Sequence, residues 1–520
     1  MKYKAYCEYV SSEGIKLFTA VLLPQGKGKF PCVVVRTPYV DWLEEKSEGF
    51  ILDLCTGEST EWLDRGYGIV VQHCRGRGKS GGECIPYINE GVDSNNLYNW
   101  IREQDFYNGE LYLMGSSYLT SVHYCAQPYA SDIKGAIFGA QDTERYNLCY
   151  RNGVLKKELQ PSWYVSMYKA KSKIKKNYKD DSFEMLPLIG FSKEVFGEDV
   201  SDFNNMLLSP HITDGFWQTH AGGRDARGAT DNLDFPVLYI TGFYDIYTGG
   251  IFDMWNKMDE SSRNNSVLVV SPYDHNDGCV KDSIVFKNGK RKEKFGANYP
   301  IDWFDSVRKP DTSSFVKGKV TYFTLFENEW HTDEFYKSGM TVTIPLGKER
   351  ASYTYNPENP PKFNGGLSCN FGGAQFQPEA NLRDDVISVY TAPFDRDTVV
   401  QGKMTAKLTV FSDCEDTCFY MRISIEKSEG DYGLRDDITT LCHQLGDYVP
   451  NTEVTLDFGF DEHSFLIKKG ERLRIDISSA DSANYVRHTN NKGLYSTQTT
   501  VKIAKNTVDL SKSVITLPIL

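Results

Sequence analysis

An apolar run breaks off at a glycine and two serines in LYLMGSSYLT, residues 111–120, and a segment with helical spacing follows it. A strand that turns sharply into a helix exposes the residue at the turn above the edge of a sheet, and such a turn needs small residues close by. Gly115 meets that need two residues before Ser117. Leu119 stands where the general G-x-S-x-G pattern has its second glycine, so the motif alone also fits an ordinary strand-ending turn.

Similar apolar runs occur on both sides of this stretch. PCVVVRTPYV (31–40) and GYGIVVQHC (66–74) precede it, and FPVLYITGFYD (235–245) and NSVLVVSPYDH (265–275) follow it. Continuous apolar runs suit strands that are buried on both faces of a parallel sheet. Between the runs, EGVDSNNLYNWIREQ (90–104) has the spacing of an amphipathic helix. The alternation predicts an α/β fold with a doubly wound sheet.

Two regions depart from this pattern. Residues 145–232 predict a mostly helical insertion, with KKELQPSWYVSMYKAKSKIKK (156–176) as a lysine-rich helix. Beyond about residue 350 the apolar period changes to two, which over many short strands indicates an antiparallel β-sandwich. We therefore expect a core formed by 1–144 and 233–348, a cap over 145–232, and a β domain over 349–520.

Charge and composition argue against several classes of partner. The formal net charge of -12 disfavours nucleic acid or an anionic membrane, because phosphate binding needs a basic face. The N-terminal MKYKAYCEYV does not resemble a signal peptide, and no stretch approaches the length of an apolar transmembrane helix. The twelve cysteines are scattered without a CxxC pair, so we expect free thiols in the cytoplasm and neither a metal nor a cofactor.

Three residues with catalytic chemistry follow directly after apolar runs: Ser117, Asp245 and His275. The carboxyl ends of parallel strands meet at one edge of an open α/β sheet, and the order Ser, Asp, His is that of the α/β-hydrolase triad. His275 would take the serine proton, and Asp245 would fix the imidazole tautomer and stabilise the imidazolium. Taken singly, the three also fit a turn, a helix N-cap and a surface histidine; their coincidence in this order favours the catalytic interpretation.

A candidate oxyanion site follows the first run. Pro38 fixes a turn, and the phenol of Tyr39 next to it can donate a hydrogen bond to a tetrahedral intermediate. The backbone N–H of Tyr118 would be the second donor. The alternative for Tyr39 is ordinary packing under a lid.

The whole pattern resembles the CocE/NonD-type serine hydrolases, the family of cocaine esterase, α-amino-acid ester hydrolases, glutaryl-cephalosporin acylases and X-Pro dipeptidyl peptidases. The resemblance implies an α/β-hydrolase core with an inserted helical cap and a C-terminal all-β jelly-roll domain. It also implies Ser117 as nucleophile with Asp245 and His275, and Tyr39 and Tyr118 at the oxyanion hole. The matching segments are Pro38-Tyr39, QHCRGRGKSGG (72–82), EGVDSNNLYNWI (90–101), GSSYLT (115–120), GFYD (242–245), SPYDH (271–275), YFTLFENEW (322–330), YTYNPENPP (353–361) and GERLRIDISSADSANYVRHTN (470–490).

The chain departs from the family pattern at four positions near the predicted site. Thr120 stands where the family has glycine, and His73 stands where aspartate is usual. Phe243 and Tyr273 replace the tryptophans before the acid and the histidine. None of the four removes a catalytic group, so we expect activity with an altered substrate preference.

The same resemblance indicates which substrates the acyl pocket accepts. The α-amino-acid ester hydrolases carry carboxylates just after the triad aspartate to hold the substrate ammonium, whereas this chain has Ile246, Tyr247 and Thr248. The implied acyl pocket is more apolar, with Tyr247 in its wall and Tyr146 and Trp163 of the cap as further candidates. Ordinary packing inside the cap is the alternative for these aromatic side chains.

The expected reaction is acyl transfer to water through an acyl-serine, with a small ester or amide as the partner molecule; a homo-oligomer is compatible with the sequence. A second hypothesis is a peptidase that removes N-terminal dipeptides ending in proline, which needs a group to bind the free N-terminus. A third is a sugar-binding β domain beside an inactive core, against which the intact Ser117, Asp245 and His275 speak.

Overall fold

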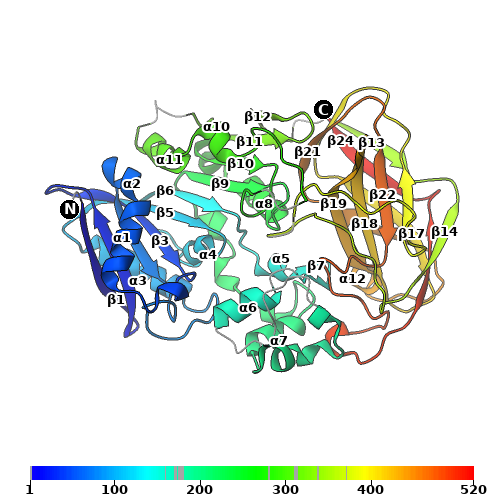
Figure 1. The fold of residues 1–520 in the computed structure, drawn as a ribbon, viewed down its shortest axis with the longest axis horizontal. Helices are drawn as coiled ribbons and strands as arrows, with labels where there is room; N and C mark the ends of the chain where they lie inside the picture. Colours follow the sequence, from blue (N-terminus) through cyan, green and yellow to red (C-terminus); the bar gives the residue numbers. More distant parts are fainter. Residues whose placement is uncertain are drawn as a thin grey trace.

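The chain forms three parts in a computed structural model that describes residues 3–157, 160–168, 173, 181–278, 282–309, 314–336, 339–369 and 372–520. A mixed sheet with its helices occupies one end of the molecule, and a β-sandwich occupies the other (Figure 1). A set of short helices lies between them along one side (Figure 1).

The core is one ten-stranded sheet, and the predicted α/β-hydrolase architecture is confirmed. Every pairing from β4 through β11 is parallel, whereas β1, β2 and β12 pair antiparallel at the two edges. In order across the sheet, the strands are β1 (Lys4–Ser12), β2 (Ile15–Leu23), β4 (Gly68–His73), β3 (Phe30–Thr37), β5 (Tyr107–Ser116), β6 (Ile133–Gly139), β9 (Val237–Gly242), β10 (Val267–Ser271), β11 (Lys319–Thr324) and β12 (Glu329–Asp333).

Helices cover both faces of this sheet, which explains why its strands are continuous apolar runs. In β3, Val34 packs in the cluster that contains Leu97 of α3, whereas its neighbour Val33 packs in the cluster that contains Trp303 of α11. Both valines are fully buried. The helices of the core are α1 (Glu48–Glu58), α2 (Thr60–Asp64), α3 (Glu90–Arg102), α4 (Tyr118–Tyr124), α8 (Thr248–Lys257), α9 (Glu260–Asn265), α10 (Arg291–Phe295) and α11 (Tyr299–Arg308), with the short turn η1 (Asp41–Leu43).

The cap consists of short helices and turns around a buried ion pair. Arg145 binds Asp202 at 2.5 Å and also donates to the hydroxyl of Tyr164 at 2.8 Å. The expected long helix over 156–176 is described only as α6; residues 158–159, 169–172 and 174–176 of it lie outside the described part of the chain. The elements are α5 (Arg145–Cys149), β7 (Tyr150–Arg151), β8 (Val154–Leu155), α6 (Gln160–Tyr168), η2 (Asp181–Glu184), η3 (Leu188–Gly190), η4 (Ser192–Phe196), α7 (Ser201–Leu207), η5 (Gly215–Gln218), η6 (Arg224–Ala226) and η7 (Ala229–Asn232).

The C-terminal part is a sandwich of an eight-stranded and a four-stranded sheet. Its strands include the alternating segments identified in the sequence, but β18 is buried on both faces for most of its length. The strands are β13 (Met340–Pro345), β14 (Arg350–Tyr355), β15 (Ile387–Tyr390), β16 (Thr398–Gly402), β17 (Thr405–Ser412), β18 (Cys418–Lys427), β19 (Gly430–Thr440), β20 (Val454–Gly459), β21 (His463–Ile467), β22 (Leu473–Ser478), β23 (Ala504–Asp509) and β24 (Val514–Ile519), with α12 (Leu441–Leu445) and η9 (Tyr495–Thr497).

The boundary between core and sandwich lies earlier than the sequence indicates. The last core strand, β12, ends at Asp333, and β13 already pairs with β24 of the sandwich. Residues 340–345 therefore belong to the sandwich although we expected them in the core. Met340, Val342 and Ile344 alternate with threonines and so indicate a strand, but this alternation does not show which sheet the strand joins.

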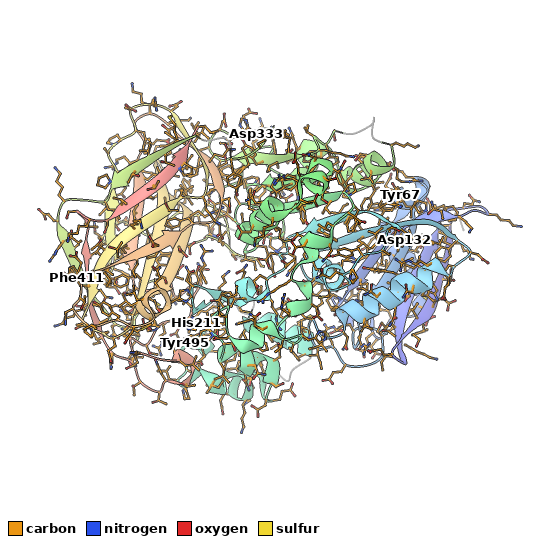
Figure 2. All side chains as sticks on the ribbon, turned by 180° about the vertical axis from the view of Figure 1, so that it is seen from behind. Tyr67, Asp132, His211, Asp333, Phe411 and Tyr495 are labelled. Atoms are coloured by element: carbon orange, nitrogen blue, oxygen red, sulfur yellow. The ribbon has the colours of Figure 1, made fainter. Side chains whose placement is uncertain are left out.

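The cap and the sandwich contact each other directly. Arg151 of β7 binds Asp437 at 2.7 Å and Asp461 at 2.9 Å across this contact. His211 of the cap and Tyr495 of the sandwich line a common cavity there (Figure 2). No helix in the described residues has the length and apolar character needed to cross a bilayer.

Candidate active site

Ser117 sits at a strained turn between β5 and α4. Its backbone has φ 57° and ψ -133°, a conformation that a side chain with a Cβ adopts only at a cost. Gly115 allows this turn, because a Cβ there would collide with the carbonyl oxygen of Leu119. The N–H of Ser117 donates to the carbonyl of Gly139 on the neighbouring strand at 2.9 Å. The structure therefore has the geometry of a nucleophile elbow although Leu119 breaks the general motif.

Asp245 and His275 follow the ends of β9 and β10 and contact each other. Nδ1 of His275 is 2.9 Å from Oδ1 of the fully buried Asp245. The hydroxyl of Thr241 donates to the other carboxylate oxygen at 3.2 Å, and the N–H of Tyr247 donates to Oδ1 at 3.3 Å. These contacts fix the carboxylate. The carboxylate in turn orients the imidazole through Nδ1, which leaves Nε2 as the nitrogen available for proton transfer.

Ser117 and His275 line a single cavity of about 350 Å³. Its wall carries no Asp, Glu, Lys or Arg side chain among the described residues and is rich in aromatic side chains. Tyr247 and Trp163 contribute to it, as the resemblance implied. The other lining residues include Tyr39, Tyr87, Tyr118, Leu119, Gln141, Leu148, Asn276 and Cys369.

Tyr146 does not reach this cavity, which corrects the expectation for that residue. Its ring stacks on Tyr150, with centroids 5.5 Å apart, and its hydroxyl donates to the carbonyl of Pro210 at 2.9 Å. The same hydroxyl accepts from the N–H of Gly153 at 3.1 Å. Tyr146 is thus part of the packing of the cap, and Leu148 of the same segment lines the cavity instead.

Tyr39 is placed on the loop after β3 with its hydroxyl close to the nucleophile. Nε1 of Trp163 donates to this hydroxyl at 3.4 Å, so the phenol keeps its own proton for another acceptor. Burial raises the pKa of Tyr39 to about 12, partly offset by hydrogen bonds with Trp163 and Ser117. Although 41% of the residue is exposed, the phenol is protonated near neutral pH and can act as a donor.

The backbone N–H of Tyr118 is the second candidate donor. It belongs to the first residue of α4, and the first N–H groups of a helix have no acceptor within that helix. The side chain of Tyr118 is fully engaged elsewhere, since its hydroxyl donates to Glu90 at 2.9 Å and accepts from the N–H of Tyr87 at 2.9 Å.

Comparison with known proteins identifies the family of this chain. The model of the X-Pro dipeptidyl-peptidase (S15) family matches residues 13–277, just over half of the chain. The chain belongs to this family. The model of the X-Pro dipeptidyl-peptidase C-terminal non-catalytic domain matches residues 318–513, which include every strand of the sandwich except β24 and also β11 and β12 of the core.

Individual relatives of this S15-family chain align with it over nearly its full length. Cocaine esterase of Rhodococcus sp. (strain MB1 Bresler) is 23% identical over 549 residues, covering 93% of this chain and 91% of that protein. Among solved structures, an aminopeptidase from a marine sediment Thaumarchaeota archaeon has a TM-score of 0.83 at 17% identity, covering 100% of this chain and 97% of that chain. An α-amino acid ester hydrolase has a TM-score of 0.81 at 16% identity with the same coverage.

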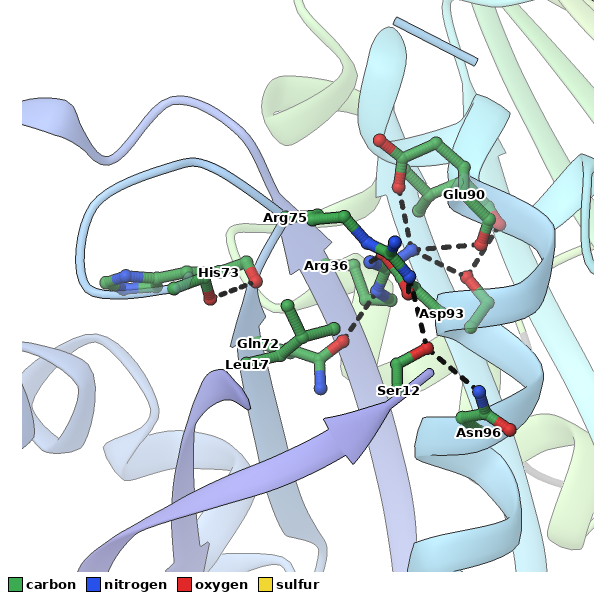
Figure 3. Close-up of polar contacts among 12 residues, drawn as sticks. Ser12, Leu17, Arg36, Gln72, His73, Arg75, Glu90, Asp93 and Asn96 are labelled. Carbon is green, nitrogen blue, oxygen red and sulfur yellow. Dashed lines mark hydrogen bonds and ion pairs between the residues drawn. The ribbon is translucent and has the colours of Figure 1, made fainter. Parts of the chain in front are cut away.

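A buried charge network supports the elbow of this S15-family site (Figure 3). Arg36 of β3 donates to Glu90 of α3 at 2.8 Å and to the hydroxyl of Ser94 at 2.9 Å. Glu90 also accepts the hydrogen bond from Tyr118, next to the nucleophile. Arg75 binds Asp93 at 2.6 Å beside it. The network thus connects β3, α3 and the loop after β4 to the residue that follows Ser117.

Glu90→Gln is expected to lower the free energy of unfolding by about 3–5 kcal/mol, because it leaves the buried Arg36 without a principal counter-charge. Urea titration followed by tryptophan fluorescence measures the change. Lys407→Ala is the matched control, since it breaks an ion pair to Asp457 of 2.7 Å whose two side chains are 63% and 72% exposed. That control should cost less than about 1 kcal/mol. Equal effects of the two substitutions would show that the Glu90 network does not stabilise the core.

Arg77 links the loop that carries Tyr39 to the cap. Its buried guanidinium donates to the carbonyl of Pro38 at 2.8 Å and to the carbonyls of Ser166 and Met167, at the end of α6, at 2.5 and 3.0 Å. Trp163 on the same helix donates to Tyr39. We assigned no role to Arg77 from the sequence, because its partners, three backbone carbonyls and the carboxylate of Asp41 at 2.6 Å, lie on other segments of the chain.

The four departures from the family pattern have structural explanations. Thr120 is buried, and its hydroxyl donates to the carbonyl of Gly139 at 3.1 Å. Burial lowers the pKa of His73 to about 4, so its neutral ring accepts from the N–H of Lys79 at 3.3 Å. Phe243 packs against His463 of the sandwich, and the hydroxyl of Tyr273 donates to the carbonyl of Phe286. None of the four departures is among the residues that line the cavity.

Proposed function

We propose that this S15-family protein is a serine hydrolase that cleaves esters, and activated amides, of small neutral acyl groups. The observation that carries the proposal is the cavity in which Ser117 and His275 lie together, with Asp245 bonded to the imidazole. The relative named cocaine esterase and the structural neighbour named α-amino acid ester hydrolase support esters as the substrate class.

In the proposed reaction, Nε2 of His275 removes the proton of Ser117 while Oγ attacks the carbonyl carbon. The phenol of Tyr39 and the N–H of Tyr118 donate to the oxyanion that forms. Collapse of this intermediate expels the alcohol, which receives the proton from His275. A water molecule, deprotonated by the same imidazole, then attacks the acyl-serine and releases the acid and the free hydroxyl of Ser117.

The proposed preference for neutral acyl groups rests on the cavity wall. A dipeptide substrate or an amino-acid ester brings a free ammonium group, and burying an unpaired charge is costly. The described lining residues supply no carboxylate to pair with it. The geometry therefore favours the esterase over the dipeptidyl-peptidase hypothesis.

A comparison of matched substrates tests this choice. We expect a higher kcat/KM for the nitrophenyl ester of propionate than for that of alanine, which differs from it by the α-ammonium group. Nitrophenyl butyrate should likewise be cleaved faster than Ala-Pro-nitroanilide. Faster turnover of the dipeptide anilide than of all simple esters would instead assign the protein as a peptidase.

Tyr39→Phe is expected to lower kcat for nitrophenyl butyrate by about 100- to 1000-fold with little change in KM, because it removes one oxyanion donor. Steady-state kinetics separates the two parameters. Tyr9→Phe, which removes the hydroxyl of a tyrosine on the edge strand β1, is the matched control and should match the wild type. Retention of kcat within about threefold in Tyr39→Phe would exclude the phenol as a principal donor.

We also infer a reducing, cytoplasmic location for the protein. The eleven cysteines within the described residues form no disulfide, and eight of them are buried. Free, buried thiols are typical of proteins in reducing compartments.

A further inference from the structure

Gln141 lies beside the candidate nucleophile without a role in the proposed reaction. It comes two residues after the end of β6, whose last residue, Gly139, accepts the hydrogen bond from the N–H of Ser117. Its own backbone carbonyl accepts from the hydroxyl of Tyr124 at 3.3 Å. Gln141 therefore lies on a fixed segment, and it lines the same cavity as Ser117 and His275.

The side-chain amide of Gln141 is only half satisfied. The residue is 3% exposed, and Nε2 donates to the backbone carbonyl of Asp142 at 3.2 Å. This bond assigns the nitrogen to that side, which leaves Oε1 as the group available to the cavity. Oε1 accepts no hydrogen bond from the described residues. Oε1 is not one of the fully buried atoms that lack a partner, so it is accessible from the cavity, where a donor on a bound molecule can reach it.

Most of the other polar side chains of the cavity are already engaged. Ser117, His275 and Tyr39 serve the reaction, the hydroxyl of Tyr118 is bonded to Glu90, and Asn276 donates to the carbonyl of Cys369 at 3.0 Å. The rest of the wall includes Tyr87, Leu119, Leu148, Trp163 and Tyr247, together with the exposed Ser116 and the buried Cys369. Gln141 thus combines deep burial with an acceptor that no donor of the described residues occupies, whereas Ser116 and Asn276 are exposed.

We propose that Gln141 is a specificity determinant whose Oε1 accepts a hydrogen bond from a neutral donor on the acyl group, so that the preferred substrates are esters of hydroxy acids. This inference rests on the proposed esterase function and names its substrate class. A hydroxyl fits better than an ammonium group, because one amide oxygen does not replace the hydration of a full charge. The carboxylate of Asp142 does not supply that charge, since it does not line the cavity and is bonded to Asn147.

The proposal is tested with nitrophenyl esters of 3-hydroxybutyrate and 3-methylbutyrate, which differ by a hydroxyl in place of a methyl group. Each kcat/KM is divided by the alkaline hydrolysis rate of the same ester to remove its intrinsic reactivity. In the wild type we expect a corrected preference of about 10- to 100-fold for the hydroxy ester, as a single buried acceptor provides. Gln141→Leu should abolish the preference while still hydrolysing the methyl ester, and Gln218→Leu on the cap should preserve it.

Each other outcome has a defined meaning. An unchanged preference in Gln141→Leu, or an equal loss with both esters, would overturn the role of Gln141 and leave the esterase function intact. A greater preference for the ester of 3-aminobutyrate would overturn the assignment to a neutral donor. Failure of the wild type to cleave any of the three esters would instead contradict the proposed esterase function itself.

Discussion

Ser117→Ala is expected to lower kcat for nitrophenyl butyrate by about 10⁴- to 10⁶-fold, because without the hydroxyl no acyl-serine forms and only the oxyanion donors and binding remain. The substitution should leave the fold unchanged. Alanine keeps the Cβ that the turn at φ 57° already accommodates, and the N–H to Gly139 is preserved. Steady-state kinetics together with the thermal unfolding temperature measures both effects.

Ser116→Ala is the sharpest control for this experiment. Ser116 is the last residue of β5 and offers a second hydroxyl one position earlier in the same glycine–serine–serine turn. Hydrolysis should persist in this variant, since the strained backbone that projects the side chain at the elbow belongs to Ser117 and not to Ser116. A large loss in Ser116→Ala with activity retained in Ser117→Ala would show that the nucleophile has been misassigned by one residue.

Asp245→Asn is expected to lower kcat by about 10⁴-fold, because an amide cannot stabilise the imidazolium and favours the wrong tautomer of His275. This expectation rests on the distance of 2.9 Å between Oδ1 of Asp245 and Nδ1 of His275. Asp274→Asn provides the matched control, since Asp274 is also buried and immediately precedes His275. Burial raises the pKa of Asp274 to about 6, yet its carboxylate accepts from the N–H of Asn276 rather than holding the ring. A larger loss in Asp274→Asn than in Asp245→Asn would contradict the assigned acid.

Most of the core could be predicted from sequence because burial on both faces leaves a simple signal. Val33 and Val34 face opposite helix layers, so the strand contains no polar alternation and reads as a continuous apolar run. The predicted catalytic residues follow such runs, and parallel strands bring their carboxyl ends to one edge. The proximity of these residues was therefore predictable. The elbow motif was harder to recognise, because Leu119 replaces its second glycine and Gly115 alone provides the necessary space.

The features that sequence did not predict depend on contacts between distant segments. Cys369, from the segment of the sandwich between β14 and β15, lines the same cavity as His275. Arg77 joins Pro38 to the end of α6 through backbone carbonyls, which carry no sequence signal. We wrongly predicted Tyr146 in the wall of the cavity for a related reason. Nothing in the sequence distinguishes an aromatic residue that packs within the cap from one that faces a cavity.

The central claim is that Ser117 forms a covalent bond with the acyl group, and active-site labelling tests it most directly. The protein is treated with a fluorophosphonate, and the modified residue is located by peptide mass spectrometry. We predict one adduct per chain, on Ser117, with complete loss of ester hydrolysis and no adduct in Ser117→Ala. An active protein that remains unmodified, or that carries its adduct on another residue, would contradict the account.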